Sequence, residues 1–250
     1  MEVFLSNLKT LKSYGATGLK AEFESEYLDD STLIFLNNLA KSSELDFTIK
    51  LSGAGSIHDL VRTFKLGATN IVSPMIETPY ALEKFVNSID LIYSTWANSF
   101  NFFINIETIE SFNNFEKIIN SPYFNRIKGV VFGRSDFAHS LGLKCKDTNS
   151  TEILNYAIHI SSVLQNLDKM FIIGGAINPN SIDFLLKIPY LSAFETRKVI
   201  FNSSALYTNP KISILKALEF EIEWLKNKEL TLPFEDERIK RLSNYLQPTL

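Results

Sequence analysis

Cysteine is almost absent from this chain, and so are the signals that would assign it to several broad classes of protein. Cys145 is the single cysteine, which excludes an internal disulfide framework and a zinc cluster built from cysteines. Lysine and arginine number 25 against 28 acidic residues, and no basic run stands out, so the sequence predicts no nucleic-acid partner. No stretch approaches the ~20 apolar residues of a membrane span, and the first residues lack the basic flank and long apolar run of a signal peptide. We therefore expect a cytoplasmic protein with no membrane partner.

What the sequence does contain is a regular alternation of short apolar segments and segments of helical periodicity. Strands are predicted at residues 18–24, 47–51, 70–74, 102–107, 129–133, 170–174 and 192–196. Helices are predicted between them, for example at residues 58–66, 80–87, 109–119 and 152–164. Strands that alternate with such helices form a parallel sheet, and near-continuous apolar runs are typical of strands buried on both faces. For 250 residues without a break in composition, this pattern predicts an α/β fold, a single (β/α)8 TIM barrel over residues 1–210.

The two ends of the chain are less regular than its centre. Only seven strands are clear, and the eighth is placed at residues 1–5 as a short, atypical first strand. Residues 211–250 carry apolar residues at helical spacing from Ile214 to Leu225, and we predict a C-terminal helical extension that packs on the barrel or on a partner subunit. We accordingly expect a homo-oligomer. The mixed-charge segment 235–241 predicts the solvated start of a helix.

Charged residues collect at or just after the carboxyl ends of the predicted strands. In a barrel these ends form the rim of the active site, because all the strand-to-helix loops meet there. One charged residue after one strand means little, but the same placement after almost every strand predicts a functional site. The set comprises Glu22, Glu24, Lys50, Glu77, Glu107, Asp136, Glu195, Arg197 and Lys198.

Two acidic residues of this set follow consecutive strands. Glu107 ends the strand at 102–107 and Asp136 follows the strand at 129–133, so their carboxylates should be adjacent at the barrel mouth. Two carboxylates, completed by waters and substrate oxygens, suit Mg²⁺ or Mn²⁺. The alternative is that each carboxylate pairs with a nearby arginine or caps a helix.

Three short motifs at strand ends resemble those of one known family. They are Val-Ser-Pro-Met-Ile-Glu-Thr at 72–78, Ile-Glu-Thr at 106–108, and Gly-Arg-Ser-Asp-Phe at 133–137 with Leu-Gly at 141–142. In this order they resemble the HpcH/HpaI aldolase and citrate lyase β-subunit family. The resemblance runs from about Gly18 to Gly142 and continues more weakly through residues 174–176.

This resemblance implies a lyase or aldolase that uses a divalent metal and acts on a carbon–carbon bond of a pyruvate-like 2-keto acid through an enolate. Family members bind Mg²⁺, Mn²⁺ or a similar ion through residues that match Glu107 and Asp136. Backbone N–H groups of the turn at Gly133, Arg134 and Ser135 would hold the substrate carboxylate, because consecutive amides form an anion-binding nest. The implied partners are the 2-keto acid and an aldehyde or acyl compound.

Two departures from the family pattern concern the catalytic groups. Where the family usually has an arginine near the keto oxygen, this chain has Lys50, which keeps a charge for enolate stabilisation but loses the planar fork. A Schiff base on Lys50 is the less favoured alternative, because a metal makes it redundant. The early strand lacks the His–Asp base of many relatives, so proton transfer is assigned to Glu22, Glu24 or His139. Burial can raise the pKa of a glutamate toward that role, with Glu22 slightly favoured, whereas pairing with a lysine works against it.

The strand end at 194–198 is unusually rich in charge. Arg197 and Lys198 are interpreted as receivers of an anionic substrate tail, such as a second carboxylate or a phosphate. The alternative is a structural ion pair between Glu195 and Arg197.

Two other functions stay open at this point. A phosphoenolpyruvate-using barrel enzyme would need cations for the phosphate, which Lys50, Arg197 and Lys198 can supply. A degenerate barrel would bind a metabolite without turnover. The missing His–Asp base favours the degenerate barrel, and the Glu107–Asp136 pair opposes it.

Overall fold

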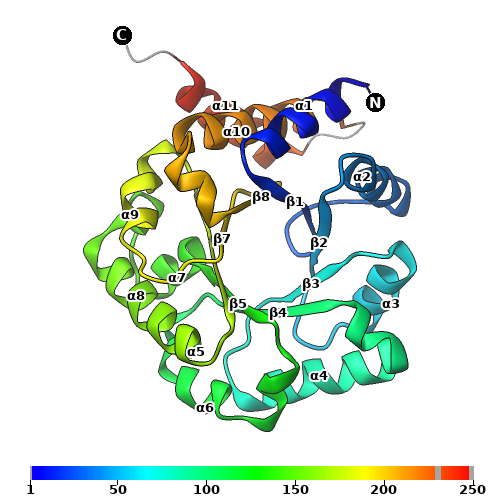
Figure 1. The fold of residues 1–250 in the computed structure, drawn as a ribbon, viewed down its shortest axis with the longest axis vertical. Helices are drawn as coiled ribbons and strands as arrows, with labels where there is room; N and C mark the ends of the chain where they lie inside the picture. Colours follow the sequence, from blue (N-terminus) through cyan, green and yellow to red (C-terminus); the bar gives the residue numbers. More distant parts are fainter. Residues whose placement is uncertain (1, 229–231, 248–250) are drawn as a thin grey trace.

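The computed structural model describes residues 2–228 and 232–247. Eight strands close into a barrel in the order of the sequence, with helices around the outside (Figure 1). The strands are β1 (Ala16–Glu22), β2 (Asp46–Lys50), β3 (Asn70–Ser73), β4 (Asn101–Ile106), β5 (Gly129–Gly133), β6 (Met170–Gly174), β7 (Ala193–Glu195) and β8 (Val199–Asn202). The predicted α/β barrel is therefore confirmed, as are its seven clear strands.

The outer layer consists of α-helices and short 3-10 helices. The helices are α1 (Glu2–Ser13), α2 (Asp30–Ser42), α3 (Ile57–Leu66), α4 (Pro79–Tyr93), α5 (Ile109–Asn113), α6 (Phe115–Ile119), α7 (Arg134–Ser140), α8 (Thr151–Asn166), α9 (Ile182–Leu186), α10 (Pro210–Lys226) and α11 (Pro233–Leu246), with η1 (Ser94–Ser99), η2 (Pro122–Arg126), η3 (Cys145–Asn149), η4 (Pro179–Ser181) and η5 (Ser203–Tyr207). The helix predicted at 109–119 is two helices, α5 and α6. They separate at Asn114, whose side-chain amide donates to the carbonyl of Glu77 at 3.0 Å. Among the described residues no helix is both long enough and apolar enough to cross a membrane.

The eighth strand is not where the sequence placed it. Residues 2–5 begin α1, and residue 1 lies outside the described part of the chain. The helix forms because Phe4, Leu8 and Leu11 recur at helical spacing and are buried together. The closing strand is β8, which returns directly from β7 as a hairpin and runs antiparallel to both β7 and β1. The last strand therefore departs from the all-parallel pattern that the sequence predicted, whereas β7 still pairs with β6 in parallel.

The barrel interior changes from apolar to polar along the strands. A small apolar cluster packs inside the barrel: Val72, Phe103, Val131, Ile172, Ala193 and Ile200. On β4 the side chains alternate between the two faces, so the face that carries Phe103 also carries Asn105 and, beyond the strand end, Glu107. The register of β1 and β2 pairs Glu22 with Lys50, which brings both to the same rim. Polar groups are thereby concentrated at the carboxyl ends of the strands.

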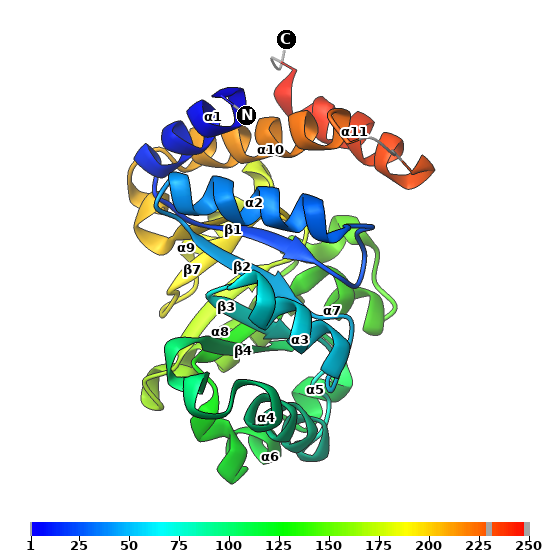
Figure 2. The same ribbon diagram turned by 90° about the vertical axis from the view of Figure 1, so that its right-hand side faces the viewer.

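Helices α10 and α11 lie together at one side of the barrel beside α1 (Figure 1). The ring of Phe4 in α1 packs edge-on against Phe220 and Trp224 of α10, with centroids 5.9 Å apart in each case. Helix α11 extends beyond α10 toward the side at which β1 and β2 end (Figure 2). The C-terminal helices thus pack on their own barrel and reach its mouth.

Candidate active site

A cavity of about 840 Å³ lies at the carboxyl ends of the strands. This volume is within the usual range for a small-molecule site. Nine of the eleven residues to which the sequence assigned a catalytic, substrate-binding or metal-binding role line it: Glu22, Glu24, Lys50, Glu107, Gly133, Ser135, Asp136, His139 and Arg197. The remaining two, Arg134 and Lys198, do not line it. The rim of the barrel therefore gathers most of the predicted site into one space.

Glu107 is fixed at the floor of this cavity by three donors. Its side chain is almost fully buried, and Oε1 accepts the backbone N–H of Met75 at 3.0 Å. Oε2 accepts from the Lys50 ammonium at 3.1 Å and from the Asn105 amide at 2.7 Å. A Cβ on residue 133 would lie 2.9 Å from Oε2, so glycine at that position leaves room for the carboxylate. Glu107 is thereby held in one orientation.

Asp136 stands in the first turn of α7, immediately after β5. Its side chain is exposed to the cavity and makes no hydrogen bond or ion pair with another described residue. Partial burial, followed by the negative charge of Glu107, raises the pKa of Asp136 above its ordinary value. The two carboxylates therefore lie close enough to repel each other, which is the arrangement that a bound cation would relieve.

The oxygen atoms near these carboxylates fit a hard divalent cation. Asn105 is buried, and its Oδ1 has no hydrogen-bond partner although the residue lines the cavity beside Glu107. A buried carbonyl oxygen without a donor needs a partner, and Mg²⁺ and Mn²⁺ prefer such oxygen ligands. Among residues 2–228 and 232–247, no cluster of three or more His, Cys, Asp and Glu side chains suited to a metal occurs. The protein would supply only a few oxygens, as sites that keep open positions for substrate do.

Lys50 is a buried cation shared between two carboxylates. Its ammonium lies 2.6 Å from Glu24 and 3.1 Å from Glu107. Burial alone would lower the pKa of Lys50, but these two carboxylates outweigh it and raise the pKa above its ordinary value. The side chain is therefore a fixed positive charge, and the neutral amine that a Schiff base requires is disfavoured.

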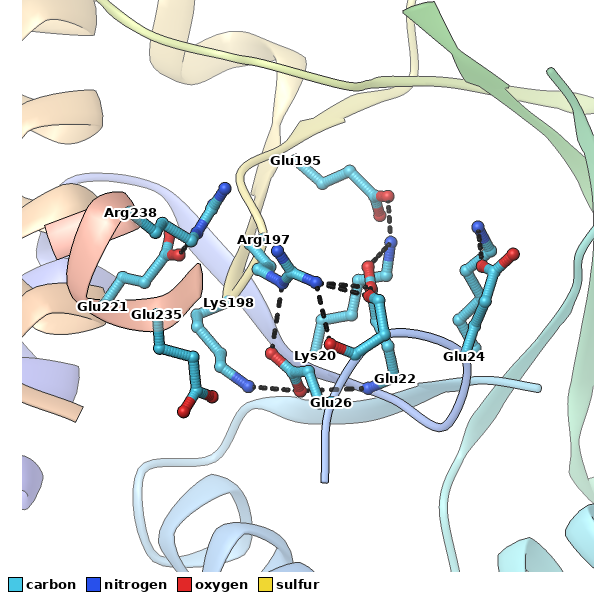
Figure 3. A network of polar contacts seen from close by, with 12 residues as sticks. Lys20, Glu22, Glu24, Glu26, Glu195, Arg197, Lys198, Glu221, Glu235 and Arg238 are labelled. Carbon is cyan, nitrogen blue, oxygen red and sulfur yellow. Dashed lines mark hydrogen bonds and ion pairs between the residues drawn. The ribbon is translucent and has the colours of Figure 1, made fainter. Parts of the chain in front are cut away.

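A network of ion pairs lies where the end of β1 and the segment after it meet the β7–β8 hairpin (Figure 3). Lys20 is paired with Glu195 and lies 3.5 Å from Glu22. Arg197 lies 3.5 Å from Glu22 and 3.3 Å from Glu26. Glu195 thus pairs with a lysine, and the predicted alternative of a Glu195–Arg197 pair is wrong.

The same network overturns the expectation for Glu22. Burial alone would raise its pKa, but the charges of Lys20 and Arg197 and a hydrogen bond from Ser25 lower it to about 2. A carboxylate with so low a pKa is a weak proton acceptor at neutral pH. The sequence left burial and pairing in competition at Glu22; pairing dominates in the structure, which argues against the slight preference for Glu22 as the base.

Arg134 plays a structural part through its side chain. The guanidinium is fully buried, donates to the carbonyls of Gly174 at 3.1 Å and Gly175 at 2.7 Å, and lies over the ring of Phe184. The prediction concerned its backbone, and there a Cβ on residue 175 would lie 2.7 Å from the amide nitrogen of Arg134 and 2.6 Å from that of Ser135. Glycine at 175, where φ is +80°, keeps the space beside these amides clear. The nest therefore stays a proposal, whereas the Arg134 side chain is not part of it.

Lys198 lies outside the cavity. Its ammonium is fully buried, 2.7 Å from Glu26 and over the ring of Trp224. The β7–β8 hairpin turns this side chain behind the barrel wall, so the predicted contact with a substrate tail is wrong for Lys198. Arg197 does line the cavity, but its guanidinium is already engaged by Glu22 and Glu26.

Sequence reasoning missed part of the cavity wall. Asn105 was overlooked, although it precedes Glu107 by two residues and so shares its face of β4. Helix α11 was expected to be solvated at its start. Glu235 is instead buried and paired with Lys228, and two arginines of the same helix, Arg238 and Arg241, line the cavity. The helical spacing of the cavity-lining residues on α11 could have indicated this face, but the mixed charge of the segment suggested a solvated helix instead.

The fold and cavity together define an α/β-barrel protein with an acidic pair and a buried lysine at the carboxyl-terminal mouth. Residues 50–168 match the HpcH/HpaI aldolase/citrate lyase family, which confirms the predicted resemblance over this central segment. The matched segment contains Lys50, Glu107, Asp136 and His139. No curated protein matches the sequence.

Several solved structures share the fold. The citrate synthase SbnG is 15% identical over 86% of this chain and 89% of its own, with a TM-score of 0.60. An HpcH/HpaI aldolase/citrate lyase family protein from Burkholderia cenocepacia J2315 is 13% identical over 86% and 90%, with a TM-score of 0.64. The HpcH/HpaI aldolase from Desulfitobacterium hafniense DCB-2 is 11% identical over 91% of each chain, with a TM-score of 0.61. At these identities the similarity establishes the barrel alone.

Proposed function

We propose that this protein is a divalent-metal-dependent lyase or aldolase that makes or breaks a carbon–carbon bond next to a 2-keto acid through an enolate. The observation that carries the proposal is the convergence of Lys50, Glu107 and Asp136 on one cavity from the ends of β2, β4 and β5. All three residues fall within the segment that matches the aldolase and citrate lyase family. Their chemistry combines two anionic oxygen ligands with one fixed cation.

Each residue has a distinct part in this proposal. Glu107 and Asp136 would hold Mg²⁺ or Mn²⁺, which when bound withdraws charge from the keto oxygen as a Lewis acid. Lys50, fixed by Glu24 and Glu107, directs a positive charge into the cavity where the enolate develops. The amides beside Gly175 would bind the carboxylate of the acid.

Proton transfer falls to His139 in this scheme. Its imidazole lines the cavity one turn after Asp136 on α7 and makes no hydrogen bond or ion pair with another described residue. Histidine is the side chain best suited to exchange protons near neutral pH. Glu24 is the second candidate, but its carboxylate is engaged by Lys50 at 2.6 Å.

Two of the three cations that the sequence assigned to the phosphate of phosphoenolpyruvate do not serve that alternative. Lys198 is buried outside the cavity, and Arg197 is already paired. A degenerate binding barrel, the other alternative, would not require the two repelling carboxylates at its mouth.

The test is a condensation assay with Mn²⁺ or with chelator. Pyruvate and phosphoenolpyruvate are each offered with a series of aldehydes, and products are identified by mass spectrometry. We expect metal-dependent product from pyruvate. Product from phosphoenolpyruvate alone would favour the alternative enzyme, and Mn²⁺ binding without product from any pair would favour the degenerate barrel.

A further inference from the structure

We infer that the cavity contains a second binding site, for an oxyanion carried by the compound that reacts with the 2-keto acid. The site lies on α11 and consists of Arg238, Arg241 and Tyr245. This inference rests on the proposed function and names its second substrate class: an aldehyde or acyl compound with a carboxylate or phosphate at its far end.

The first observation is the size of the cavity. A pyruvate-sized acid fills roughly 200 Å³, taking the ~30 Å³ share of a water molecule for each non-hydrogen atom. The cavity holds about 840 Å³. Most of the space therefore lies beyond the keto acid and has room for a second compound.

The second observation is that one face of α11 forms a wall of this space. Arg238, Arg241, Leu242 and Tyr245 all line the cavity. Their spacing of three, four and seven residues places them on a single stripe of the helix. The wall is thus a continuous helical face that carries two guanidinium groups and one phenol.

Arg238 is oriented by a buried carboxylate. Its Nε donates to Glu221 of α10, which is fully buried (Figure 3). Neither terminal nitrogen of Arg238 donates a hydrogen bond to a described residue. The pairing therefore fixes the guanidinium on its inner edge and leaves its outer edge for a ligand.

Arg241 has no ionic partner of its own. Within the described ranges it makes no hydrogen bond and no salt bridge, and neither does the hydroxyl of Tyr245. The guanidinium of Arg197, by contrast, is paired with Glu22 and Glu26. An arginine fork matches the geometry of carboxylate and phosphate oxygens, so two forks one turn apart form a site for an oxyanion.

Charge also orients the second compound. Arg238 and Arg241 carry positive charge on the α11 wall, whereas the charges of Glu107 and Asp136 would be balanced by the proposed metal. An anionic tail is therefore attracted to the two arginines of α11. The reacting carbonyl end is then directed toward the keto acid.

The experiment compares matched compounds with and without the charge. In turnover, 5-oxopentanoate is compared with pentanal, and glyceraldehyde 3-phosphate with glyceraldehyde. In binding, calorimetry uses the inert probes glutarate and glycerol 3-phosphate, with glycerol as the neutral reference. We expect wild type to favour the anionic member of at least one pair by about tenfold or more in KM, and Arg241→Gln to lose most of that preference. The pair that shows the effect identifies the tail as carboxylate or phosphate.

Three variants make the result specific. Lys240→Gln, an exposed change on α11 outside the cavity, should retain the wild-type preference. Arg241→Lys should retain part of it, because the charge remains while the fork is lost. Arg238→Gln is made together with Glu221→Gln, so that no unpaired carboxylate is left buried, and should lower the preference like Arg241→Gln.

The outcomes separate this inference from the proposed function. Turnover of neutral and anionic aldehydes with equal KM overturns the second site while the proposed function stands. Absence of turnover, with glutarate or glycerol 3-phosphate bound by wild type and about tenfold more weakly by Arg241→Gln, supports the second site although the proposed reaction has failed. Binding of these probes that is equal in wild type and Arg241→Gln overturns it.

Discussion

The central segment, residues 50–168, and the two flanking segments contribute to the same cavity in different ways. From the centre come Lys50, Glu107 and Asp136, each placed directly at a strand end and directed at the same small volume. From the flanks come Glu22 and Arg197, which are paired within an ion network.

This difference teaches that the ends of parallel strands position reactive groups, while the flanks close and stabilise the space around them. The central carboxylates repel each other, and the pKa of Asp136 is raised. Among the flanking carboxylates, Glu22 is held at a pKa of about 2 by its cations. Substitutions of the central carboxylates and Lys50 should therefore affect chemistry, and substitutions within the ion network of the flanks should affect stability.

The largest effect is expected at the two central carboxylates. Glu107→Gln and Asp136→Asn each remove an anionic oxygen ligand, so Mn²⁺ affinity and metal-dependent activity should fall by more than about 100-fold. Calorimetry with Mn²⁺ measures the first and the condensation assay the second. Glu152→Gln, an exposed change that makes no ion pair with a described residue, is the control. Unchanged Mn²⁺ affinity in the double variant would place the metal elsewhere.

Loss of the central cation should rank next. Lys50→Met removes the charge that faces the developing enolate, and we expect kcat to fall by about 100-fold or more, with partial recovery in Lys50→Arg. Circular dichroism checks that the variants fold. Borohydride treatment of wild type with pyruvate should leave the protein mass unchanged; a trapped adduct on Lys50 would show covalent catalysis instead.

In the flanks the effect moves to stability. Lys198→Met leaves Glu26 buried without its closest cation, and we expect a loss of about 3 kcal/mol in the free energy of unfolding. The double variant Glu26→Gln/Lys198→Met should recover much of this. Denaturant unfolding measures both, with the exposed Lys187→Met as control. Equal stability of Lys198→Met and Lys187→Met would contradict a structural role for the pair.

The smallest effect is the pH dependence contributed by Glu22. Because its pKa in the folded protein is lowered from 4.5 to about 2, its stabilising contribution is present above pH 4.5 and is lost as pH falls toward 2. A shift of this size corresponds to roughly 3 kcal/mol as an upper value. The free energy of unfolding of wild type should therefore fall more steeply over this pH range than that of Glu22→Gln. Parallel curves would show that Lys20 and Arg197 do not stabilise the carboxylate.

The same division marks what could be predicted from the sequence. The strands of the centre are regular apolar runs followed by charged residues, so the barrel and the positions of Glu107 and Asp136 follow from local pattern. The hairpin of β7 and β8 has no such pattern, because the strands are short and the turn is dense in charge. Whether a charged residue faces the cavity or pairs with another side chain depends on which residues of opposite charge the fold brings to it.

That dependence explains the errors at Glu22 and Lys198. Each lies at or next to a strand end, where the sequence predicts a functional group. The partners that decide their states come from distant segments: Arg197 meets Glu22, and Glu26 meets Lys198. Helix α11 shows the reverse case, in which a mixed-charge face predicted to be solvated lines the cavity. Pairing over long sequence separation is not visible in local pattern.

The central claim is that this chain holds a metal that promotes proton transfer from a 2-keto acid, and deuterium exchange at C3 of pyruvate tests it most directly. The measurement is the rate of exchange in D₂O, followed by mass spectrometry, for wild type with Mn²⁺, for metal-stripped wild type and for His139→Asn with Mn²⁺. We expect rapid exchange only in the first, since the base and the metal site are both intact there. Exchange in metal-stripped protein at the same rate as in the loaded protein, or no exchange in either, would contradict the account. Exchange in His139→Asn at the wild-type rate would leave the metal in place and move the base to Glu24.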